Sequence, residues 1–166
     1  MKSKLVLAAL LLLLPASLAW SQTISGAFCS EDGKAHVVYA TGRTSVIHPE
    51  PKQVGCTYIS IADDKHTVGW ATLVENCCTS YPIAVALVVL KDDKKIVIPS
   101  PEMVWEWRFI DGGKRLVLLS GPVHGRAAEA GLYDAQSGRK LESWDGSDSP
   151  PRWAEGWEDD FSSGTK

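Results

Sequence analysis

The chain lacks the excess of basic residues that nucleic-acid-binding proteins carry. It holds 17 lysine and arginine residues against 20 aspartate and glutamate residues, for a net charge of −3. Removal of the first 19 residues would take away two of the lysines, which leaves 15 basic and 20 acidic residues and a net charge of −5. Phosphate binding needs clustered lysine and arginine. We therefore expect no nucleic acid among the partners of this protein.

Sequence motifs for nucleophilic catalysis and for metal binding are missing as well. The chain contains no Gly-x-Ser-x-Gly nucleophile elbow and no Cys-x-x-Cys pair. Its four histidines are scattered along the sequence at His36, His48, His66 and His124. The stretch Asp145–Asp148 has the residue types of a calcium loop but neither its length nor its terminal glutamate. We therefore expect neither a metal nor a cofactor.

A hydrolytic site is the alternative to a protein without enzymatic activity. His124 lies in a glycine-rich loop after an expected strand, where a histidine can act as a general base. Its carboxylate partner would be Asp111 or Asp134. Because the sequence orients no carboxylate toward this histidine, a role in the turn is the simpler interpretation. We expect a non-enzymatic protein.

The first 19 residues have the pattern of a secretory signal peptide. Two lysines precede the unbroken apolar run Leu5–Leu14, and small residues follow up to Ala19. The run is shorter than the ~20 residues that a membrane-spanning helix needs, and no later run approaches that length. We expect cleavage after Ala19, with Ser21 as the alternative, and a secreted or periplasmic protein. Residues 20–148 would then form one domain, followed by an acidic tail at 149–166.

A polar turn followed by a strand occurs three times along the chain. Ser30–Thr41 matches Ile61–Thr72, and Phe109–Leu119 is a looser third copy. Turn residues recur every ~8–12 residues, which is typical of an all-β meander. The expected strands cover Thr23–Phe28, Ala35–Thr41, Thr44–His48, Thr57–Ile61, His66–Val74, Ile83–Leu90, Lys95–Ile98, Val104–Phe109, Arg115–Ser120, Ala128–Tyr133 and Lys140–Trp144.

The repeat extends beyond one hairpin and defines a unit of four strands. Leu87–Ile96 aligns with Leu132–Leu141, which gives one unit over Thr57–Ile98 and another over Val104–Trp144. The stretch from Thr23 to about Val54 is a truncated or irregular first unit. The sequence therefore predicts an all-β protein with two to three blade-like units of antiparallel strands, in an open sheet or a sandwich, with a short C-terminal helix or tail.

Two short motifs in the last unit carry a family resemblance. They are Phe-x-Asp-Gly-Gly-Lys at residues 109–114, before a buried strand, and Leu132–Arg139, before the outer strand. With them, Phe109–Gly146 resembles a blade of the WD-repeat or Tol-associated propeller type. Known propellers close with at least four blades, whereas this chain holds about two and a half. The resemblance implies a monomeric open form, which we favour, or a propeller fragment whose ring closes by oligomerisation.

Four cysteines remain after signal cleavage, and an even count in an exported chain favours disulfides. Cys56 precedes the first expected strand of the middle unit, while Cys77 and Cys78 follow the second strand. Because these positions meet at one edge of a meander, we expect a bridge from Cys56 to one of that pair. Cys29 should lie nearer the opposite edge, unless the irregular first unit is turned. A Cys77–Cys78 ring is disfavoured by strain.

Most of the tryptophans are expected in the core. Trp70, Trp107 and Trp144 lie on strands where burial of a large ring is favourable. Trp105 lies two residues before Trp107, so the two rings should share one sheet face, with Glu106 on the other. For Trp105 both packing and a platform for carbohydrate or protein stay open.

The acidic tail carries three aromatic residues with helical spacing. Trp153, Trp157 and Phe161 fall at i, i+4 and i+8, which indicates one face of a helix. Gly156 inside that run weakens the helix by ~1 kcal/mol. The segment either covers an exposed sheet face or edge or docks onto a partner through its aromatic residues.

The sequence thus favours an exported module that binds a protein or another component of the cell envelope. The candidate binding residues are Trp105, Trp153, Trp157 and Phe161. Exposure of these rings as one contiguous patch would support binding.

Overall fold

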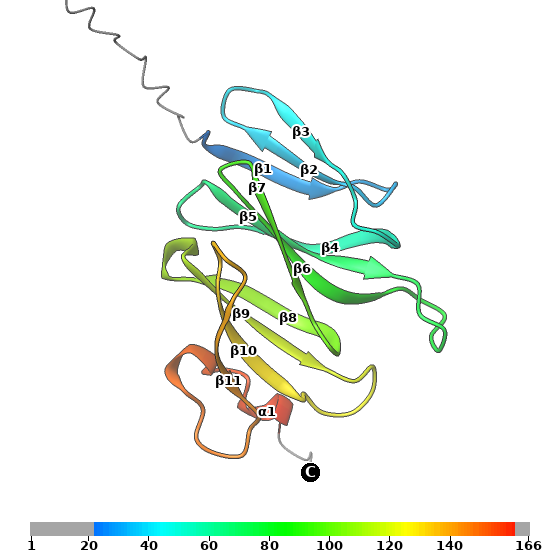
Figure 1. The fold of residues 1–166 in the computed structure, drawn as a ribbon, viewed down its shortest axis with the longest axis vertical. Helices are drawn as coiled ribbons and strands as arrows, with labels where there is room; N and C mark the ends of the chain where they lie inside the picture. The colour runs from blue at the N-terminus through cyan, green and yellow to red at the C-terminus, as the bar shows by residue number, and fades with distance from the viewer. Residues whose placement is uncertain (1–21, 162–166) are drawn as a thin grey trace, which may run out of the picture.

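The computed structural model describes residues 22–161, which fold into eleven strands in three antiparallel sheets (Figure 1). Consecutive strands are hydrogen-bonded neighbours in every sheet, so each sheet is a simple meander. The N-terminal sheet contains β1 (Ile24–Cys29), β2 (Ala35–Tyr39) and β3 (Thr44–Ile47). The middle sheet contains β4 (Gln53–Ile61), β5 (Thr67–Val74), β6 (Ile83–Lys91) and β7 (Lys94–Pro99). The C-terminal sheet contains β8 (Met103–Ile110), β9 (Arg115–Gly121), β10 (Glu129–Asp134) and β11 (Lys140–Trp144).

These three sheets confirm the expected all-β class and the two four-stranded units. The first unit has three strands, as the irregular start of the repeat predicts. The arrangement is compatible with blade-like repeats. The turns behave as their residues predict: Asp92 and Asp93 both adopt positive φ angles, 48° and 60°, between β6 and β7. A two-residue hairpin needs this conformation, and aspartate tolerates it better than most residues.

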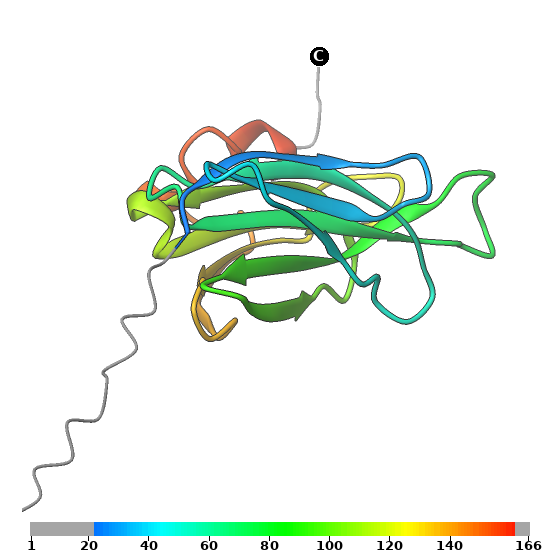
Figure 2. The ribbon, with the colours of Figure 1, turned by 90° about the horizontal axis from the view of Figure 1, so that it is seen from above.

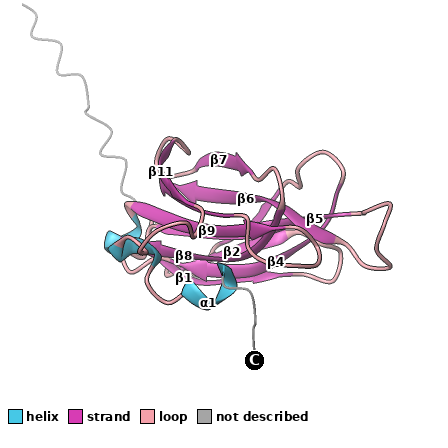
Figure 3. Cartoon of the chain, turned by 90° about the horizontal axis from the view of Figure 1, so that it is seen from below, coloured by secondary structure: helices cyan, strands magenta, loops and turns pink. Residues whose placement is uncertain are grey.

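The sheets stack one above another along the long axis of the molecule, with an apolar layer between neighbours (Figure 1). Figure 3 looks along this axis, so the strands of the three sheets overlap in that view. Strand β6 shows how the middle sheet contributes side chains to both apolar layers. Leu87 and Val89 pack toward the C-terminal sheet, while Val88 and Leu90 pack toward the N-terminal sheet. Because both faces of this strand are buried, its sequence is an apolar run rather than an alternation of apolar and polar residues.

The two ends of the stack differ. The outer face of the C-terminal sheet is covered by a third apolar layer, to which the C-terminal segment contributes Ala154 and Trp157. The outer face of the N-terminal sheet is open, and Phe28 and Val46 remain 48% and 52% exposed there. The Phe28 ring stacks on His36 with a centroid distance of 4.8 Å. Only one end of the stack is therefore capped by the described part of the chain.

The expected helical face in the tail is not formed. The segment contains a 3-10 turn at Arg152–Ala154 and a single helical turn, α1 (Glu158–Phe161). Gly156 lies between them with a φ angle of +96°. This angle is outside the helical region, so the helix cannot continue through Gly156. The helical spacing predicted that the aromatic residues of the tail lie on one face of a helix. The tail is not one continuous helix, and these residues pack against the C-terminal sheet.

The expectation that Trp105 and Trp107 share a face is wrong. Trp107 packs in the layer between the middle and C-terminal sheets, whereas Trp105 packs against the layer under the C-terminal sheet. The register of β8 with β9 shifts between Val104 and Glu106. A bulge of this kind inserts an extra residue and reverses the alternation of side chains beyond it. Trp70, Trp107 and Trp144 are buried as expected, at 2%, 7% and 7% exposure.

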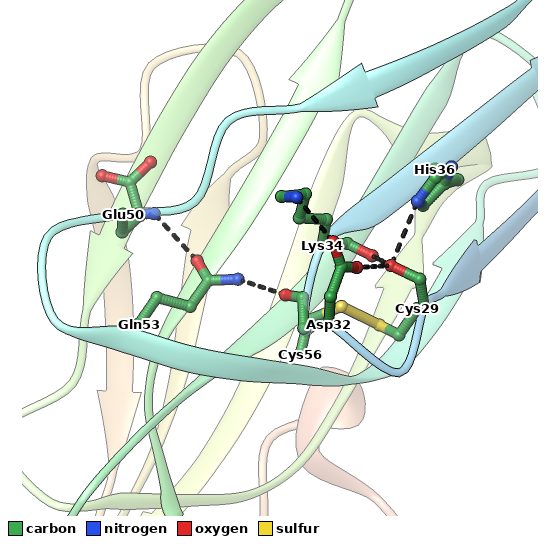
Figure 4. Close-up of a disulfide and its surroundings, with 9 residues drawn as sticks. Cys29, Asp32, Lys34, His36, Glu50, Gln53 and Cys56 are labelled. Carbon is green, nitrogen blue, oxygen red and sulfur yellow. Dashed lines mark hydrogen bonds and ion pairs between the residues drawn. A yellow bond between two sulfur atoms is a disulfide. The ribbon is translucent and has the colours of Figure 1, made fainter.

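The disulfide also differs from the expected pairing. Cys56 is bridged to Cys29, with 5.8 Å between their Cα atoms, while Cys77 and Cys78 are both free and exposed (Figure 4). Strand β4 begins at Gln53, four residues earlier than expected, so Cys56 lies within the strand and opposite Thr72. Its side chain packs toward the N-terminal sheet. There it meets Cys29, because β1 lies next to β4.

Polar contacts support this bridge from both sides (Figure 4). The Gln53 amide donates to the carbonyl oxygen of Gly33 at 3.0 Å, and the Glu50 N–H donates to the Gln53 side chain at 2.9 Å. A Cβ atom on Gly33 would lie 2.7 Å from the carbonyl oxygen of Val54. Only glycine therefore allows the β1–β2 turn to approach β4 this closely.

The predicted signal peptide, residues 1–19, lies outside the described residues, as do the last five residues of the tail. Within 22–161, no helix is both long enough and apolar enough to cross a membrane.

Candidate ligand-binding site

A pocket of about 390 Å³ opens between the middle and C-terminal sheets, on the side of the β5–β6 loop. Its walls come from β4, the end of β5, the start of β6 and the start of β8. The lining residues are Thr57, Tyr58, Leu73, Tyr81, Pro82, Ile83, Ala84, Met103, Val104 and Trp105. None of these ten side chains is charged. The volume falls in the range of pockets that hold small molecules or single side chains.

Tyr58 stands at the mouth of this pocket in an unusual backbone conformation. Its φ angle is +51°, within a strand, where the register of β4 with β5 shifts between Thr57 and Ser60. For a residue with a side chain this conformation costs about 1–3 kcal/mol. The bulge turns the ring outward, and the residue is 58% exposed. The strand therefore holds an aromatic ring in solvent at the expense of its own stability.

Tyr81 supplies a second exposed ring. It is 50% exposed at the end of the β5–β6 loop, immediately before Pro82. Proline restricts the residue before it to extended conformations. The Thr79 hydroxyl donates to the backbone carbonyl of Tyr81 at 2.6 Å. These two constraints fix the backbone that carries the ring.

Trp105 is a further lining residue and is partly buried, with its ring packed against the layer under the C-terminal sheet. Its indole N–H donates to the carbonyl oxygen of Pro122 at 3.1 Å. This bond leaves the ring without a free polar group and anchors it to the β9–β10 loop. Met103 lies two residues earlier and also lines the pocket. A thioether side chain adapts easily to irregular ligand shapes.

Two exposed tyrosine rings with apolar walls and no charge suit an apolar or aromatic group of a ligand. Binding would come from burial of apolar surface and from ring stacking. The only side-chain polar groups among the lining residues are the Thr57, Tyr58 and Tyr81 hydroxyls and the Trp105 indole N–H, which is already bonded. Carboxylates and amides that would hydrogen-bond to several sugar hydroxyls are missing from the lining.

The aromatic residues of the tail lie elsewhere. Trp153, Trp157 and Phe161 all pack in the apolar layer under the C-terminal sheet, and Trp105 reaches the edge of the same layer. Trp157 is only 2% exposed, and its indole N–H donates to Glu106 at 3.0 Å. These four residues were expected to form one binding surface. Trp153, Trp157 and Phe161 belong to the segment that covers the C-terminal sheet. The contiguous exposed patch that would favour binding is therefore not formed.

The structure does not bring the three hydrolase candidates together. His124 is exposed in the β9–β10 loop, while Asp111 and Asp134 lie at the opposite end of β9. Seven strand residues separate the two ends by ~20 Å. Asp111 forms an ion pair with Arg115.

Asp134 is also engaged within its own turn. Hydrogen bonds from the Ser137 hydroxyl, at 2.6 Å, and from the Ser137 N–H, at 2.7 Å, lower the pKa of Asp134. The carboxylate therefore serves the β10–β11 turn and does not orient a base.

Metal ligands do not gather in the described part of the chain. Within residues 22–161 there is no group of three or more histidine, cysteine, aspartate or glutamate side chains that could hold an ion.

Sequence reasoning identified Trp105 but missed Tyr58, Tyr81 and Met103. Tyr81 had one available signal, the proline that follows it at a loop end. Tyr58 had none, because a bulge inside a strand leaves no mark on the pattern of residue types. The pocket depends on the packing between two sheets, and that packing is set by residues far apart in sequence.

Comparison with protein-family models finds no match for this chain, and a search of curated proteins finds none either. The pocket is therefore interpreted from its own chemistry.

Proposed function

We propose that this protein is an exported binding module whose ligand site is the aromatic pocket between the middle and C-terminal sheets. The observation that carries the proposal is Tyr58. An exposed aromatic ring is held by a backbone conformation that costs the fold free energy. Strain of this kind persists where function needs it, and Tyr81 contributes a second exposed ring to the same lining.

The ligand we propose is a protein of the cell envelope or of the secreted fraction that inserts an apolar side chain. An uncharged lining with two exposed tyrosines and a tryptophan among its residues matches the aromatic anchors of protein interfaces. A glycan would need more hydrogen-bonding groups than the lining offers. The blade-like sheets support this role as a rigid scaffold, in keeping with the resemblance of the last unit to WD-repeat or Tol-associated propellers. The proposed location is secreted or periplasmic, which suits a disulfide-bonded chain.

The replacement Tyr58→Asn separates binding from folding. Asparagine tolerates a positive φ angle better than tyrosine does, so the variant should be as stable as the wild type or more so. It removes the ring and should abolish binding. Partners captured by wild-type protein from native envelope extract are identified by mass spectrometry, and each is then titrated directly by calorimetry. We expect at least a tenfold loss of affinity, with an unchanged or raised unfolding midpoint.

The matched control is Phe28→Ser, which removes an equally exposed ring from the open face of the N-terminal sheet. Affinity should stay within twofold of the wild type. Loss of binding in the Phe28 variant with retention in the Tyr58 variant would move the site to the other end of the stack. A Tyr58→Asn protein that unfolds more easily than the wild type and binds equally well would refute the proposal.

A further inference from the structure

The β5–β6 loop presents two adjacent thiols. Cys77 and Cys78 are both exposed, on a loop that projects beyond the sheets (Figure 2). The two residues are adjacent in sequence. The other two cysteines of the chain, Cys29 and Cys56, form a disulfide between the N-terminal and middle sheets. Neither the fold nor the aromatic pocket makes use of this pair.

The bridged pair Cys29–Cys56 and the loop pair Cys77–Cys78 differ in burial and in accessibility to solvent. The bridged pair is partly buried and packs against an apolar layer, where it is shielded from exchange. The loop pair is open to solvent, and a thiol must be accessible to react with a disulfide. The same chain therefore holds a structural disulfide and two accessible thiols.

Adjacent cysteines can close a ring, but the ring is strained. Cα atoms across a trans peptide lie ~3.8 Å apart, whereas disulfides generally span about 4.4–6.8 Å between Cα atoms. Strained and exposed disulfides are more easily reduced than structural ones. Closure is still favoured by proximity. When the first cysteine is in a mixed disulfide, its sulfur remains next to the thiol of the second cysteine. These two effects together describe a bond that forms and breaks readily.

We propose that Cys77 and Cys78 form a reversible dithiol–disulfide couple that exchanges with the disulfides of small thiols or of partner proteins. One thiolate attacks a disulfide R–S–S–R′ and forms a mixed disulfide, while R′–S⁻ leaves and takes up a proton. The second thiolate attacks the sulfur of the first cysteine and displaces R–S⁻, which is protonated in turn. The two cysteines are oxidised to one disulfide, and the substrate disulfide is reduced to two thiols.

Both thiols are exposed and adjacent, so either thiolate can make the first attack and the other cysteine then resolves the mixed disulfide. Two side-chain hydrogen bonds brace the loop beside the pair, from Asn76 to the Thr79 hydroxyl at 3.3 Å and from that hydroxyl to the Tyr81 carbonyl. The couple is independent of the proposed ligand site, although Tyr81 belongs to both regions.

The experiment uses the full chain in glutathione buffers that range from fully reduced to fully oxidised. Each sample is quenched with acid, alkylated and weighed as the intact protein. As the oxidised fraction rises, we expect a monomeric species that has lost both reactive thiols and carries no glutathione. Peptide mapping should find a 77–78 bond and an unchanged Cys29–Cys56 bridge. The ring should predominate only where oxidised glutathione is in large excess, and reduced glutathione should reopen it.

Single replacements isolate each thiol. Cys78→Ser and Cys77→Ser each leave one thiol without a neighbour that can resolve the mixed disulfide, so each variant should accumulate one glutathione per chain. The proposal is overturned if both thiols stay open to alkylation in every buffer, if wild-type protein accumulates two glutathiones per chain, or if oxidation yields only chains linked to one another.

Discussion

At the scale of single residues, Cys29 and Cys56 show how one bond can join two units of a repeat. The bridge links the end of β1 to β4 and thereby ties the N-terminal sheet to the middle sheet. The N-terminal sheet has only three strands and contacts the rest of the chain on one face. It buries less apolar surface than its neighbours, so it depends most on a covalent link.

Removal of this bridge should cost a large part of the stability of the N-terminal sheet. The bond spans 27 residues, for which the chain-entropy treatment gives about 3.5 kcal/mol. We expect Cys29→Ser/Cys56→Ser to lower the free energy of unfolding by that amount in urea titrations. Both proteins should carry Cys77→Ser and Cys78→Ser, so that the free thiols cannot shuffle. The loop replacements alone should change stability by less than ~0.5 kcal/mol, and an equal loss from them would contradict the assignment.

At the scale of strands and turns, most of the fold could be predicted because turn chemistry is local. Each expected strand has a counterpart in the structure, with ends that differ by one or two residues in all but one case. The exception is β4, which begins at Gln53, before the stretch Val54–Cys56. Because this stretch contains a glycine and follows a proline-rich turn, its residues were predicted to lie in a loop. They pair with Leu73 and Thr72 all the same, because a neighbouring strand offered them hydrogen bonds.

The features that could not be predicted come from irregular register and from contacts between sheets. The bulge before Glu106 and the bulge at Tyr58 each shift one strand against its neighbour by a residue. Such a shift moves side chains to the other face without changing the order of residue types. The shift in β8 removed Trp105 from the layer of Trp107, and the shift in β4 placed Tyr58 among the residues that line the pocket. The disulfide was mispredicted for a related reason, because it joins two sheets rather than two strands of one sheet.

The β4–β5 turn gives a prediction on pH dependence. One Asp64 carboxylate oxygen accepts hydrogen bonds from the N–H groups of His66 and Thr67 at 2.8 and 2.9 Å. The other accepts from the Thr67 hydroxyl at 2.7 Å and from Lys91 at 3.4 Å. Burial of the carboxylate opposes ionisation, but these hydrogen bonds outweigh it, so the pKa of Asp64 is lowered from 3.8. The ionised form therefore stabilises the turn.

Because the folded pKa lies below the unfolded one, this stabilisation is complete above about pH 4 and is lost as the pH falls through the folded pKa. We expect Asp64→Asn to lower the free energy of unfolding at pH 7 by about 1–2 kcal/mol. The difference from the wild type should shrink as the pH approaches 2. Urea titrations at several pH values measure it, with Asp63→Asn as the exposed neighbouring control. A gap that is constant with pH would show that the charge does not contribute.

At the scale of the whole molecule, the two ends of the stack decide which assemblies are possible. A ring built from several chains needs two complementary faces on each chain, so that one end of a stack packs on the other end of the next. Trp157 and Ala154 occupy the outer face of the C-terminal sheet. Arg108 holds Trp157 in place, with its guanidinium 4.4 Å from the ring centroid. The tail therefore fills the place that a further sheet would take.

This cap should limit the size of the assembly. We expect light scattering to give a mass of one chain or, if two open N-terminal faces meet, of two chains, and never of three or more. A chain that ends at Asp148 would expose the apolar face formed by Val117, Leu119 and Leu132, and it should form larger species or precipitate.

A point variant keeps the test decisive where the shortened chain does not fold. Trp157→Ala leaves the tail present but removes its most deeply buried ring, which should cost about 3–5 kcal/mol in the free energy of unfolding. It should also raise binding of a hydrophobic dye, because the tail detaches more often from the sheet. If the variant loses less than ~1 kcal/mol, the tail is not a cap. The face under it would then be free for another chain, and ring closure by oligomerisation would become the better account of this fold.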